Sequence, residues 1–488
     1  MSSKANVEAN LKANPKENPK QPMQDAHESA KLTPLDHGAL PAHFITQAIP
    51  GIGGVIKQRP EDFLVDEQPQ YQPSGSGEHV YIFVQKRGLS TLEMVDIIAK
   101  HFRVPKHAIG YAGLKDKHAI TRQVVSVHVP GRKPEDFPML VHDRIEILWS
   151  DLHANKLRTG HLKGNRFSIR VRNVVPTSVL NAKRVLDVLA KGGVPNRYGE
   201  QRFGILHNNH IVGARLIAGD GPGAAAALLG PCEQYPTINT QSRAAFARED
   251  YLAAFESMSP LAKTERAVLQ QLVRGRDPLR AMMSLDNRVV KFFISAAQSA
   301  VFNAVLDSRV ADGTWATILD GDIAIKLTNG APFDCDAAVA ADPATPARLA
   351  SYEISPSGPM WGASMRRAKG RVAEVEETSL ARLGLTPEMV DSFAKKYSGM
   401  MDGSRRAMRV PLIDHDVEGG VDEVGPFVRC VFELPRGSFA TVVLHEVMKP
   451  KPESLMPAID GEAGVEGEAG VHGTGPHADS IAATDIEE

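Results

Sequence analysis

Strand-forming runs lie near both ends of the central part of this chain, and helix-forming segments fill the stretch between them. Runs rich in β-branched and aromatic residues occupy residues 80–85, 124–129, 167–171, 428–434 and 441–444. Apolar residues at helical spacing predict helices over residues 92–102, 180–189 and 289–307. A helical middle between two strand-rich ends predicts an α+β protein in which one domain is inserted into another.

The length of 488 residues is enough for two or three domains with sizeable cores. Residues 219–226 and 328–347 are rich in Gly, Pro and Asp, which predicts loops. The three cysteines (Cys232, Cys335 and Cys430) are far apart and never form a C-x-x-C pattern. This spacing argues against a disulfide framework and against a cysteine zinc site, and it favours a reducing, cytoplasmic location.

The most apolar stretch of the chain, residues 289–306, does not resemble a membrane span. Lys291, Gln298 and Asn303 interrupt it, whereas a transmembrane helix needs about 20 predominantly apolar residues. The N-terminal segment also lacks the apolar core of a secretory signal. We therefore expect a protein that is not bound to a membrane.

The two ends of the chain differ in composition from its centre. Residues 1–44 are rich in Lys, Asn, Pro and Glu, and residues 451–488 hold nine Asp and Glu against one Lys. Both segments have few large apolar residues, so we expect disordered tails. Between Lys100 and Arg172, fifteen Lys and Arg accompany six Asp and Glu, although the whole chain has a net charge of -2. Such a stretch fits an anionic ligand such as nucleic acid, or a solvated basic surface without a partner.

The densest group of reactive side chains lies in residues 109–123. Asp116 stands between Lys115 and Lys117, and Arg122 follows shortly before a predicted strand. Nearby cations keep a carboxylate ionised, and an ionised aspartate can act as a nucleophile or base towards an anionic polymer. The same residues also fit a surface turn in which the aspartate pairs with its neighbouring lysines, so both interpretations stay open here.

Other patterns give weaker signals. His207 and His210 look like metal ligands, but no acidic third ligand follows at helical spacing, so a capping or RNA-facing loop is favoured. The glycine-rich stretches at 51–54 and 219–223 lack the G-x-G-x-x-G pattern of dinucleotide binding. No nucleophile-elbow sequence supports Ser-His-Asp chemistry. We therefore expect no metal site and no nucleotide cofactor.

Several stretches together resemble the TruD family of tRNA pseudouridine synthases, in the order in which that family carries them. They are RPEDFLVDE (59–67), GYAGLKDKHAITRQ (110–123), LKGNRF (162–167) with NRYGEQRFG (196–204), SAAQSAVFN (295–303) and LPRGSFAT (434–441). The resemblance runs from about residue 51 to residue 447 and leaves out both tails. It implies an enzyme that converts a tRNA uridine to pseudouridine, typically at position 13, without metal, nucleotide or redox cofactors.

The resemblance also implies an architecture. A pseudouridine synthase-like catalytic domain with a mixed, antiparallel-rich sheet would comprise residues 45–203 and 410–450. An α/β TRUD domain would be inserted at residues 204–409. The expected partner is tRNA, and the expected state is a monomer.

The family's functional residues fall on five positions of this sequence. Asp116 matches the nucleophilic aspartate; Phe63, Asn165 and Phe439 match uridine-binding residues; and Phe167 matches the aromatic residue beside the target base. Removing a base from its stack costs a few kcal/mol, and stacking on an aromatic side chain returns roughly 1–3 kcal/mol. Taken alone, each phenylalanine also fits ordinary core packing, and the asparagine in K-G-N also fits a turn.

Two other classes of protein share part of this pattern. A non-catalytic RNA-binding or RNA-chaperone protein would need the positive charge around Asp116 but not its carboxylate. A glycosidase would need a second carboxylate near the first, and the sequence places none convincingly. The presence of Asp116 together with the aromatic residues favours the isomerising enzyme.

Overall fold

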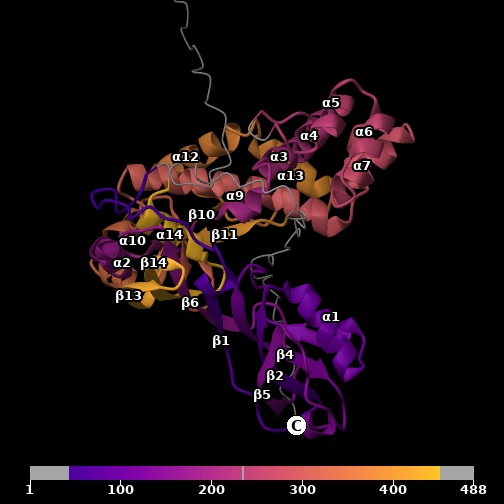
Figure 1. The fold of residues 1–488 in the computed structure, drawn as a ribbon. Coiled ribbons are helices and arrows are strands. Elements are labelled where there is room, and N and C mark those ends of the chain that lie inside the picture. Colours follow the sequence, from indigo (N-terminus) through magenta and orange to yellow (C-terminus); the bar gives the residue numbers. More distant parts are fainter. Residues whose placement is uncertain (1–42, 234–235, 451–488) are drawn as a thin grey trace, which may run out of the picture. The chain divides into compact units, whose positions relative to one another are not determined.

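The computed structural model describes residues 43–233 and 236–450, and these residues all belong to one compact unit. The two predicted tails therefore lie outside the described residues, apart from residues 43 and 44. Figure 1 shows the described helices and strands with the labels used below.

Among the described residues, eight strands form the main sheet. Its order is β13-β14-β6-β1-β4-β2-β5, and β3 pairs with β4 beyond the part of β4 that β1 contacts. Strands β1 and β4 run parallel and the other neighbours run antiparallel, so the sheet is mixed, as expected. The strands are β1 (Phe63–Pro69), β2 (His79–Arg87), β3 (Ile109–Tyr111), β4 (Ile120–His128), β5 (Ile145–His153), β6 (Leu162–Arg172), β13 (Ile413–Asp422) and β14 (Gly425–Pro435).

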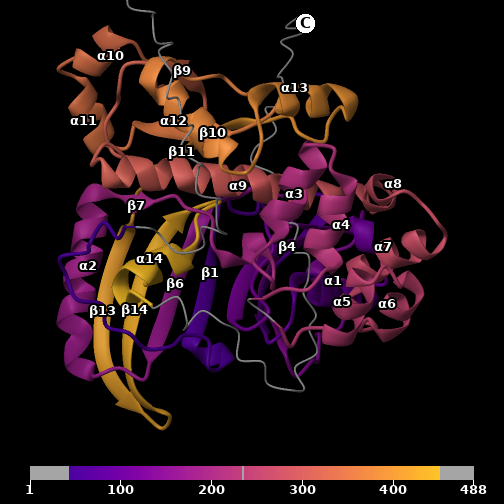
Figure 2. The ribbon, with the colours of Figure 1, turned by 90° about the horizontal axis from the view of Figure 1, so that it is seen from above.

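Strands from opposite ends of the described chain lie side by side in this sheet. Figure 2 shows the yellow strands β13 and β14 next to β6 and the indigo β1. In the register, Phe432 of β14 faces Phe167 of β6, and Phe167 faces Val65 of β1. Strands β13 and β14, from the C-terminal end, thus extend the same sheet as β1 and β6, from the N-terminal end.

Helices pack on both halves of the sheet through apolar side chains. Helix α2 (Val179–Gly192) and helix α14 (Ala440–Met448) share a buried core with β1, β6 and β14. Helix α1 (Thr91–Phe102) packs on β2 and β4 through residues such as Met94 and Ile98. Each fully buried side chain of this kind contributes about 1.5–3 kcal/mol, so these helices depend on the sheet for their stability.

Between β6 and β13 the chain forms a helical region with its own core. A small sheet with the order β11-β10-β8-β9 completes it: β8 (Ile323–Lys326), β9 (Pro332–Asp334), β10 (Ile354–Met360) and β11 (Ser404–Ala407). The helices are α3 (Asn209–Ile217), α4 (Gly221–Leu229), α5 (Thr240–Ala247), α6 (Tyr251–Ser257), α7 (Lys263–Val273), α8 (Pro278–Met283), α9 (Asn287–Ala311), α10 (Ala337–Ala341), α11 (Thr345–Ala350), α12 (Gly370–Ala381) and α13 (Pro387–Lys396).

Helix α9 is the one described helix that is long and apolar enough to cross a membrane by length and composition. In the protein, 78% of its most apolar window is buried against other parts of the chain. Such burial is what a central core helix shows, and α9 contributes Phe293, Val301 and Phe302 to the core of the helical region.

The chain leaves the main sheet and returns to it at neighbouring points. Strand β7 (Val194–Pro195) pairs antiparallel with β12 (Arg409–Val410). The Asn196 backbone N–H donates to the Met408 carbonyl over 2.8 Å, and the Asn196 side chain donates to the Ala407 carbonyl over 2.9 Å. The outgoing and returning segments are thus joined directly by hydrogen bonds.

Most of the strands and helices expected from the sequence are confirmed. Four of the predicted strand runs lie in β2, β4, β6 and β14, and the three predicted helices correspond to α1, α2 and α9. The strand predicted at 441–444 is wrong, because these residues lie in α14. A short run of β-branched residues does not distinguish a strand from a helix, and α14 is buried around most of its circumference.

The two predicted loops are also partly wrong. At 219–226 the chain enters α4, where the Asp220 side chain accepts from the Gly223 N–H over 2.8 Å and Pro222 stands in the first turn. At 328–347 lie β9, α10 and the start of α11, and Asp336 caps α10. Asp, Gly and Pro mark helix starts as well as loops, and their abundance alone does not separate the two.

Candidate active site

Asp116 lies in the turn that connects β3 to β4, and a buried lysine holds the backbone of this turn. The Lys86 ammonium is fully buried and donates to the Asp116 carbonyl over 2.8 Å and to the Leu89 carbonyl over 2.5 Å. Lys86 lies near the end of β2, the strand antiparallel to β4. The same ammonium also donates to the Lys115 carbonyl over 3.4 Å, and this charged donor fixes the path of the chain at Asp116.

A buried charge pair also holds this turn. Lys115 Nζ is 2.6 Å from Glu67 Oε2, and both side chains are almost completely buried. Glu67 also accepts from the Val124 N–H over 3.2 Å, and the Lys115 N–H donates to the Thr91 hydroxyl over 2.9 Å. The interpretation of a surface turn with both lysines at the solvent is therefore wrong for Lys115, which points into the protein.

The Asp116 side chain contacts two donors from distant parts of the chain. Lys57 Nζ lies 3.2 Å from Asp116 Oδ1, and Gln201 Nε2 lies 3.1 Å from the same oxygen. The Lys57 ammonium also stands over the Phe63 ring, 4.4 Å from its centroid. About a third of the aspartate side chain (31%) is exposed, so it is accessible as well as held in place.

Two of the predicted aromatic residues contact each other beside this carboxylate. The Phe63 and Phe167 rings meet edge to face, with centroids 6.5 Å apart, and Phe167 in turn lies 5.6 Å from Phe432. Phe63 and Phe167 are nearly buried, and they come from the neighbouring strands β1 and β6. The Lys57 ammonium therefore links an apolar wall to the Asp116 carboxylate.

Phe439 lies at the N-terminal end of α14 and contacts a different group. Its ring centroid is 6.0 Å from that of Tyr198, and a side chain added at Gly199 would meet the Phe439 ring. Tyr198 and Gly199 closely precede Gln201, which contacts Asp116. The structure thus connects Phe439 and Asp116 through one short segment, although they are far apart in the sequence.

Asn165 lies in strand β6 and not in a turn. It pairs with Glu67 of β1 on one side and with Leu434 of β14 on the other. Its Oδ1 atom is buried and has no hydrogen-bond partner among the described residues. The preceding Gly164 is required because a Cβ there would lie 2.2 Å from the Leu434 carbonyl oxygen. The turn interpretation of K-G-N is therefore wrong, and the unsatisfied oxygen fits a ligand donor.

Four side chains of this site were not predicted: Lys57, Glu67, Lys86 and Gln201. Glu67 and Gln201 lie inside the family-like stretches RPEDFLVDE and NRYGEQRFG. The resemblance of these stretches to the family could have indicated both residues. Lys57 and Lys86 lie outside those stretches, and only the folded chain brings them to Asp116.

Two arginines contact the Tyr198 ring. The Arg406 guanidinium is 4.2 Å from its ring centroid, and the Arg202 guanidinium is 5.1 Å away. Burial lowers the pKa of Arg202 from its ordinary value, while Tyr198 acts in the opposite direction. Arginine still stays protonated in proteins, so both side chains keep their positive charge.

His207 and His210 lie at the start of the helical region, and both are buried. The His210 ring packs edge-on against Phe203, with centroids 5.5 Å apart. Within residues 43–233 and 236–450, no group of three His, Cys, Asp or Glu side chains is arranged to hold a metal ion. The two histidines therefore contribute to packing here.

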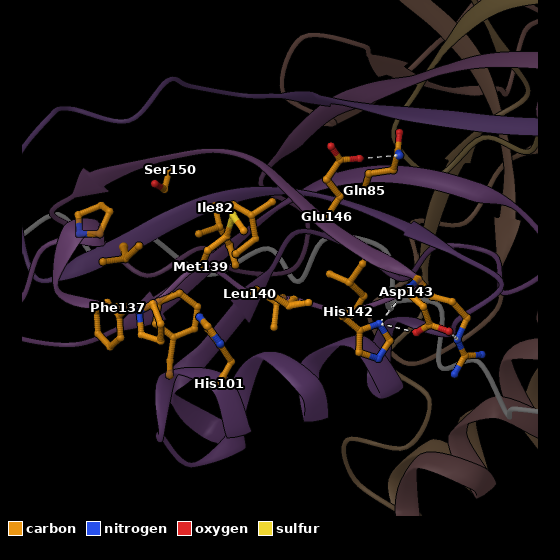
Figure 3. A pocket seen from close by; sticks show the side chains of 18 of the residues that line it. Ile82, Gln85, His101, Phe137, Met139, Leu140, His142, Asp143, Glu146 and Ser150 are labelled. Carbon is orange, nitrogen blue, oxygen red and sulfur yellow. Dashed lines mark hydrogen bonds and ion pairs between the residues drawn. The ribbon is translucent and has the colours of Figure 1, made fainter.

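A separate cavity of about 780 Å³ lies among α1, β2, β5 and the loop before β5. Figure 3 shows Ile82, Phe137, Leu140 and His101 around it, with Gln85 hydrogen-bonded to Glu146 at one end. None of the five predicted site residues lines this cavity. The cavity and the candidate active site around Asp116 are therefore lined by different residues.

Comparison with known proteins agrees with the motifs. The family model "tRNA pseudouridine synthase D (TruD)" matches residues 40–447, most of the chain. The chain belongs to the TruD family. The resemblance inferred from the sequence motifs is thereby confirmed.

Close relatives cover nearly the same region. The tRNA pseudouridine synthase D of Geobacter sulfurreducens is 42% identical over 410 residues, which is 84% of this chain and 97% of that protein. The tRNA pseudouridine synthase D of Thermus thermophilus is 36% identical over 83% of this chain and 92% of that protein. A crystal structure assigned as TruD from Methanosarcina mazei matches with a TM-score of 0.73 and 25% identity, over 86% of this chain and 99% of that one.

TruD membership also distinguishes the isomerising enzyme from the alternative classes of protein. The family and its named members are tRNA pseudouridine synthases, so the enzyme is favoured over a non-catalytic RNA-binding protein. The mixed α and β architecture expected for the family is confirmed by the structural match.

Proposed function

We propose that this protein converts a uridine of tRNA to pseudouridine, at position 13, and that Asp116 supplies the reacting carboxylate. The proposal is supported by TruD membership over residues 40–447 and by the position of Asp116 in an accessible, fixed turn. Lys57 and Gln201 hold its Oδ1 atom from two sides, which limits the orientations of the carboxylate.

The reaction breaks the bond between uracil N1 and sugar C1′ and forms a bond between uracil C5 and the same sugar carbon. C5 loses its proton and N1 gains one, so substrate and product have the same atoms. Such an isomerisation consumes no oxidant, reductant or co-substrate. The Asp116 carboxylate could add to the sugar, add to the base, or remove a sugar proton to give a glycal, and each route needs one carboxylate oxygen at the uridine.

The target base must leave its stack to reach Asp116, and we propose that the aromatic residues receive it. Phe439 is half-buried and can offer a ring face to the base, whereas the nearly buried Phe63 and Phe167 form the apolar wall behind the carboxylate. Each stacked base gains roughly 1–3 kcal/mol. The buried Asn165 Oδ1 has no described partner and suits the N3–H of uracil, which would satisfy both groups.

We further propose that the catalytic domain comprises residues 45–203 and 410–450, with a TRUD domain inserted at 204–409. The pairing of β7 with β12, where the chain leaves and returns, supports this division. We expect a cytoplasmic monomer that binds tRNA through the basic stretch between Lys100 and Arg172.

The observation that carries this proposal is the contact of Asp116 with two donors beside an apolar wall, in a chain of the TruD family. The test incubates the purified protein with unmodified tRNA and maps pseudouridine at single-nucleotide resolution. We expect one modified site, at uridine 13, which is absent with Asp116→Asn. A protein that binds tRNA but leaves every uridine unchanged would refute the proposal.

A further inference from the structure

Residues 196–203, here called the strap, connect the main sheet to the helical region and contact the proposed catalytic carboxylate. The strap follows β7 and ends with the 3-10 turn Glu200–Phe203. Gln201 lies on this turn, and its Nε2 atom donates to Asp116 Oδ1 over 3.1 Å. A residue from the connection to the helical region thus contacts the catalytic turn directly.

The strap is held by helix α9 through reciprocal hydrogen bonds. The Asn303 side chain accepts from the Tyr198 N–H over 2.9 Å and donates to the Tyr198 carbonyl over 3.0 Å. Asn303 is fully buried in α9, so this amide pair fixes the strap backbone three residues before Gln201. Arg202 adds a bond to the Ser295 hydroxyl of the same helix, over 2.9 Å.

The other side of the strap is tied to the C-terminal segment of the sheet region. Glu200 lies 3.1 Å from His445 of α14, and the Gly199 backbone lies against Phe439 and Thr441. Gln201 itself is exposed, and its neighbours on both sides are anchored. The distance between Gln201 Nε2 and Asp116 Oδ1 is therefore determined by the position of the strap backbone and not by packing of the Gln201 side chain.

We propose that Gln201 is a positioning residue for the Asp116 carboxylate, and that Asn303 of α9 sets its reach through the strap. This inference rests on the proposed function. A neutral amide donor restrains the carboxylate without neutralising its charge, whereas Lys57 restrains the same oxygen as a cation. The helical region thereby contributes to the geometry of the reacting group although it lies outside the main sheet.

The first experiment measures kcat, KM and the pH–rate profile of Gln201→Ala and Gln201→Glu on tRNA. A bond to a charged group at an exposed position is worth about a tenfold change in rate, so kcat of Gln201→Ala should fall about 10-fold with KM unchanged. Gln201→Glu should fall further, because a second carboxylate would face Asp116. In both variants the acid limb of the profile should move to higher pH, because a carboxylate that loses a donor is protonated more easily.

Gln85→Ala is the matched control, because Gln85 also donates to a carboxylate, that of Glu146, over 3.2 Å. It should keep the wild-type kcat and pH profile. Thermal unfolding of the Gln201 and Gln85 variants should match the wild type, since both glutamine–carboxylate bonds lie at the surface.

The second experiment tests the route through α9 with a double-mutant cycle. Asn303→Ala alone should lower kcat. Adding it to Gln201→Ala should cause little further loss, because both changes remove the same restraint on the Asp116 carboxylate. Fully additive losses, an unchanged kcat in Gln201→Ala, or a change confined to KM would overturn the inference while leaving the proposed function intact. An inactive wild-type protein would overturn both.

Discussion

On one side of the candidate active site, buried charges hold the Asp116 turn; on the other side, aromatic rings pack against one another. The carboxylate side consists of Lys57, Glu67, Lys86, Lys115 and Asp116, which are joined to each other or to the turn by bonds of 2.6–3.2 Å. The aromatic side consists of Phe63, Phe167 and Phe432, whose rings contact one another in sequence, and of Phe439, whose ring contacts Tyr198. Charge-assisted hydrogen bonds define the positions of their two groups closely, whereas apolar packing tolerates small displacements.

This difference predicts two kinds of mutational response. Changes on the carboxylate side should abolish the reaction or destabilise the fold, because each group there has a specific partner. Changes on the aromatic side should lower activity by degrees, because a flipped base can still be accommodated by the remaining apolar surface.

The largest expected effect is that of Asp116→Asn. Asparagine keeps the shape of aspartate but lacks a nucleophilic or basic carboxylate oxygen, so turnover should fall by at least roughly 1,000-fold. Affinity for tRNA should change less than about threefold. The substitution removes one negative charge near the phosphates, so it should not weaken binding. Pseudouridine formation and tRNA binding are measured on the same samples.

Asp66→Asn is the matched control for this change. Its side chain is 34% exposed, against 31% for Asp116, and it pairs with Arg122 at 3.4 Å. Asp66 alternates with Glu67 along β1 and so faces the opposite side of the sheet. It should keep wild-type activity. Substantial turnover by a folded Asp116→Asn protein would remove Asp116 from the mechanism.

The second prediction concerns stability on the carboxylate side. Lys115→Met leaves the buried Glu67 carboxylate without its ammonium partner at 2.6 Å, which should lower the free energy of unfolding by about 3–5 kcal/mol. Lys106→Met breaks a pair of the same length, with Asp96, in which the side chains are 69% and 42% exposed. It should cost less than about 1 kcal/mol. Urea unfolding measures both, and equal losses would contradict the role given to burial.

The third prediction tests the aromatic side with Phe439→Ala and Phe439→Leu. Loss of one stacking surface should slow turnover about 10- to 100-fold without abolishing it. Leucine restores apolar volume but not a flat ring, so Phe439→Leu should lie between alanine and wild type. Steady-state kinetics on tRNA separate kcat from KM. A complete loss of activity in folded Phe439→Ala would mean that the two sides do not differ as proposed.

The fourth prediction concerns Asn165, which lies between the two sides. Asn165→Ala should lower kcat/KM by about tenfold, the value of one neutral hydrogen bond to the base. The same change should leave stability unchanged or raise it, because it removes a buried oxygen that has no partner among the described residues. Thermal unfolding and kinetics together check it; lower stability with full activity would show a purely structural role.

The sequence predicted the parts of this site that lie in contiguous motifs, and it missed the parts that depend on folding. Asp116 and Phe63 stand in stretches whose order matches the family, so their positions could be named. No sequence pattern indicates that Lys86 will donate to the Asp116 carbonyl. This contact follows from the pairing of β2 with β4. Asn165 was open to a turn interpretation because strand pairing on both sides of it cannot be seen in a K-G-N pattern.

The same reason explains the errors in the fold. The run at 441–444 has a strand-like composition, but it follows Gly437, whose φ of 78° turns the chain out of β14. Phe439 then begins α14, whose burial is set by β14 and α2. The composition of residues 441–444 alone does not reveal this packing, so it does not predict the helix.

The smallest expected effects concern tRNA binding, which should depend on the basic residues between Lys100 and Arg172 more than on the aromatic rings. Affinity should fall steeply as salt rises, because basic residues between Lys100 and Arg172 displace counterions from phosphates. Lys100→Ala with Arg103→Ala, at the end of α1, should lower the slope of log affinity against log salt by up to about 2, whereas Phe439→Ala should leave it unchanged. Removing residues 451–488, with nine acidic side chains and one lysine, should tighten binding slightly or not at all. Binding isotherms of the wild type and the three variants at several salt concentrations measure these effects. An affinity that does not respond to salt, or weaker binding after removal of the acidic segment, would contradict an electrostatic contact with the RNA backbone.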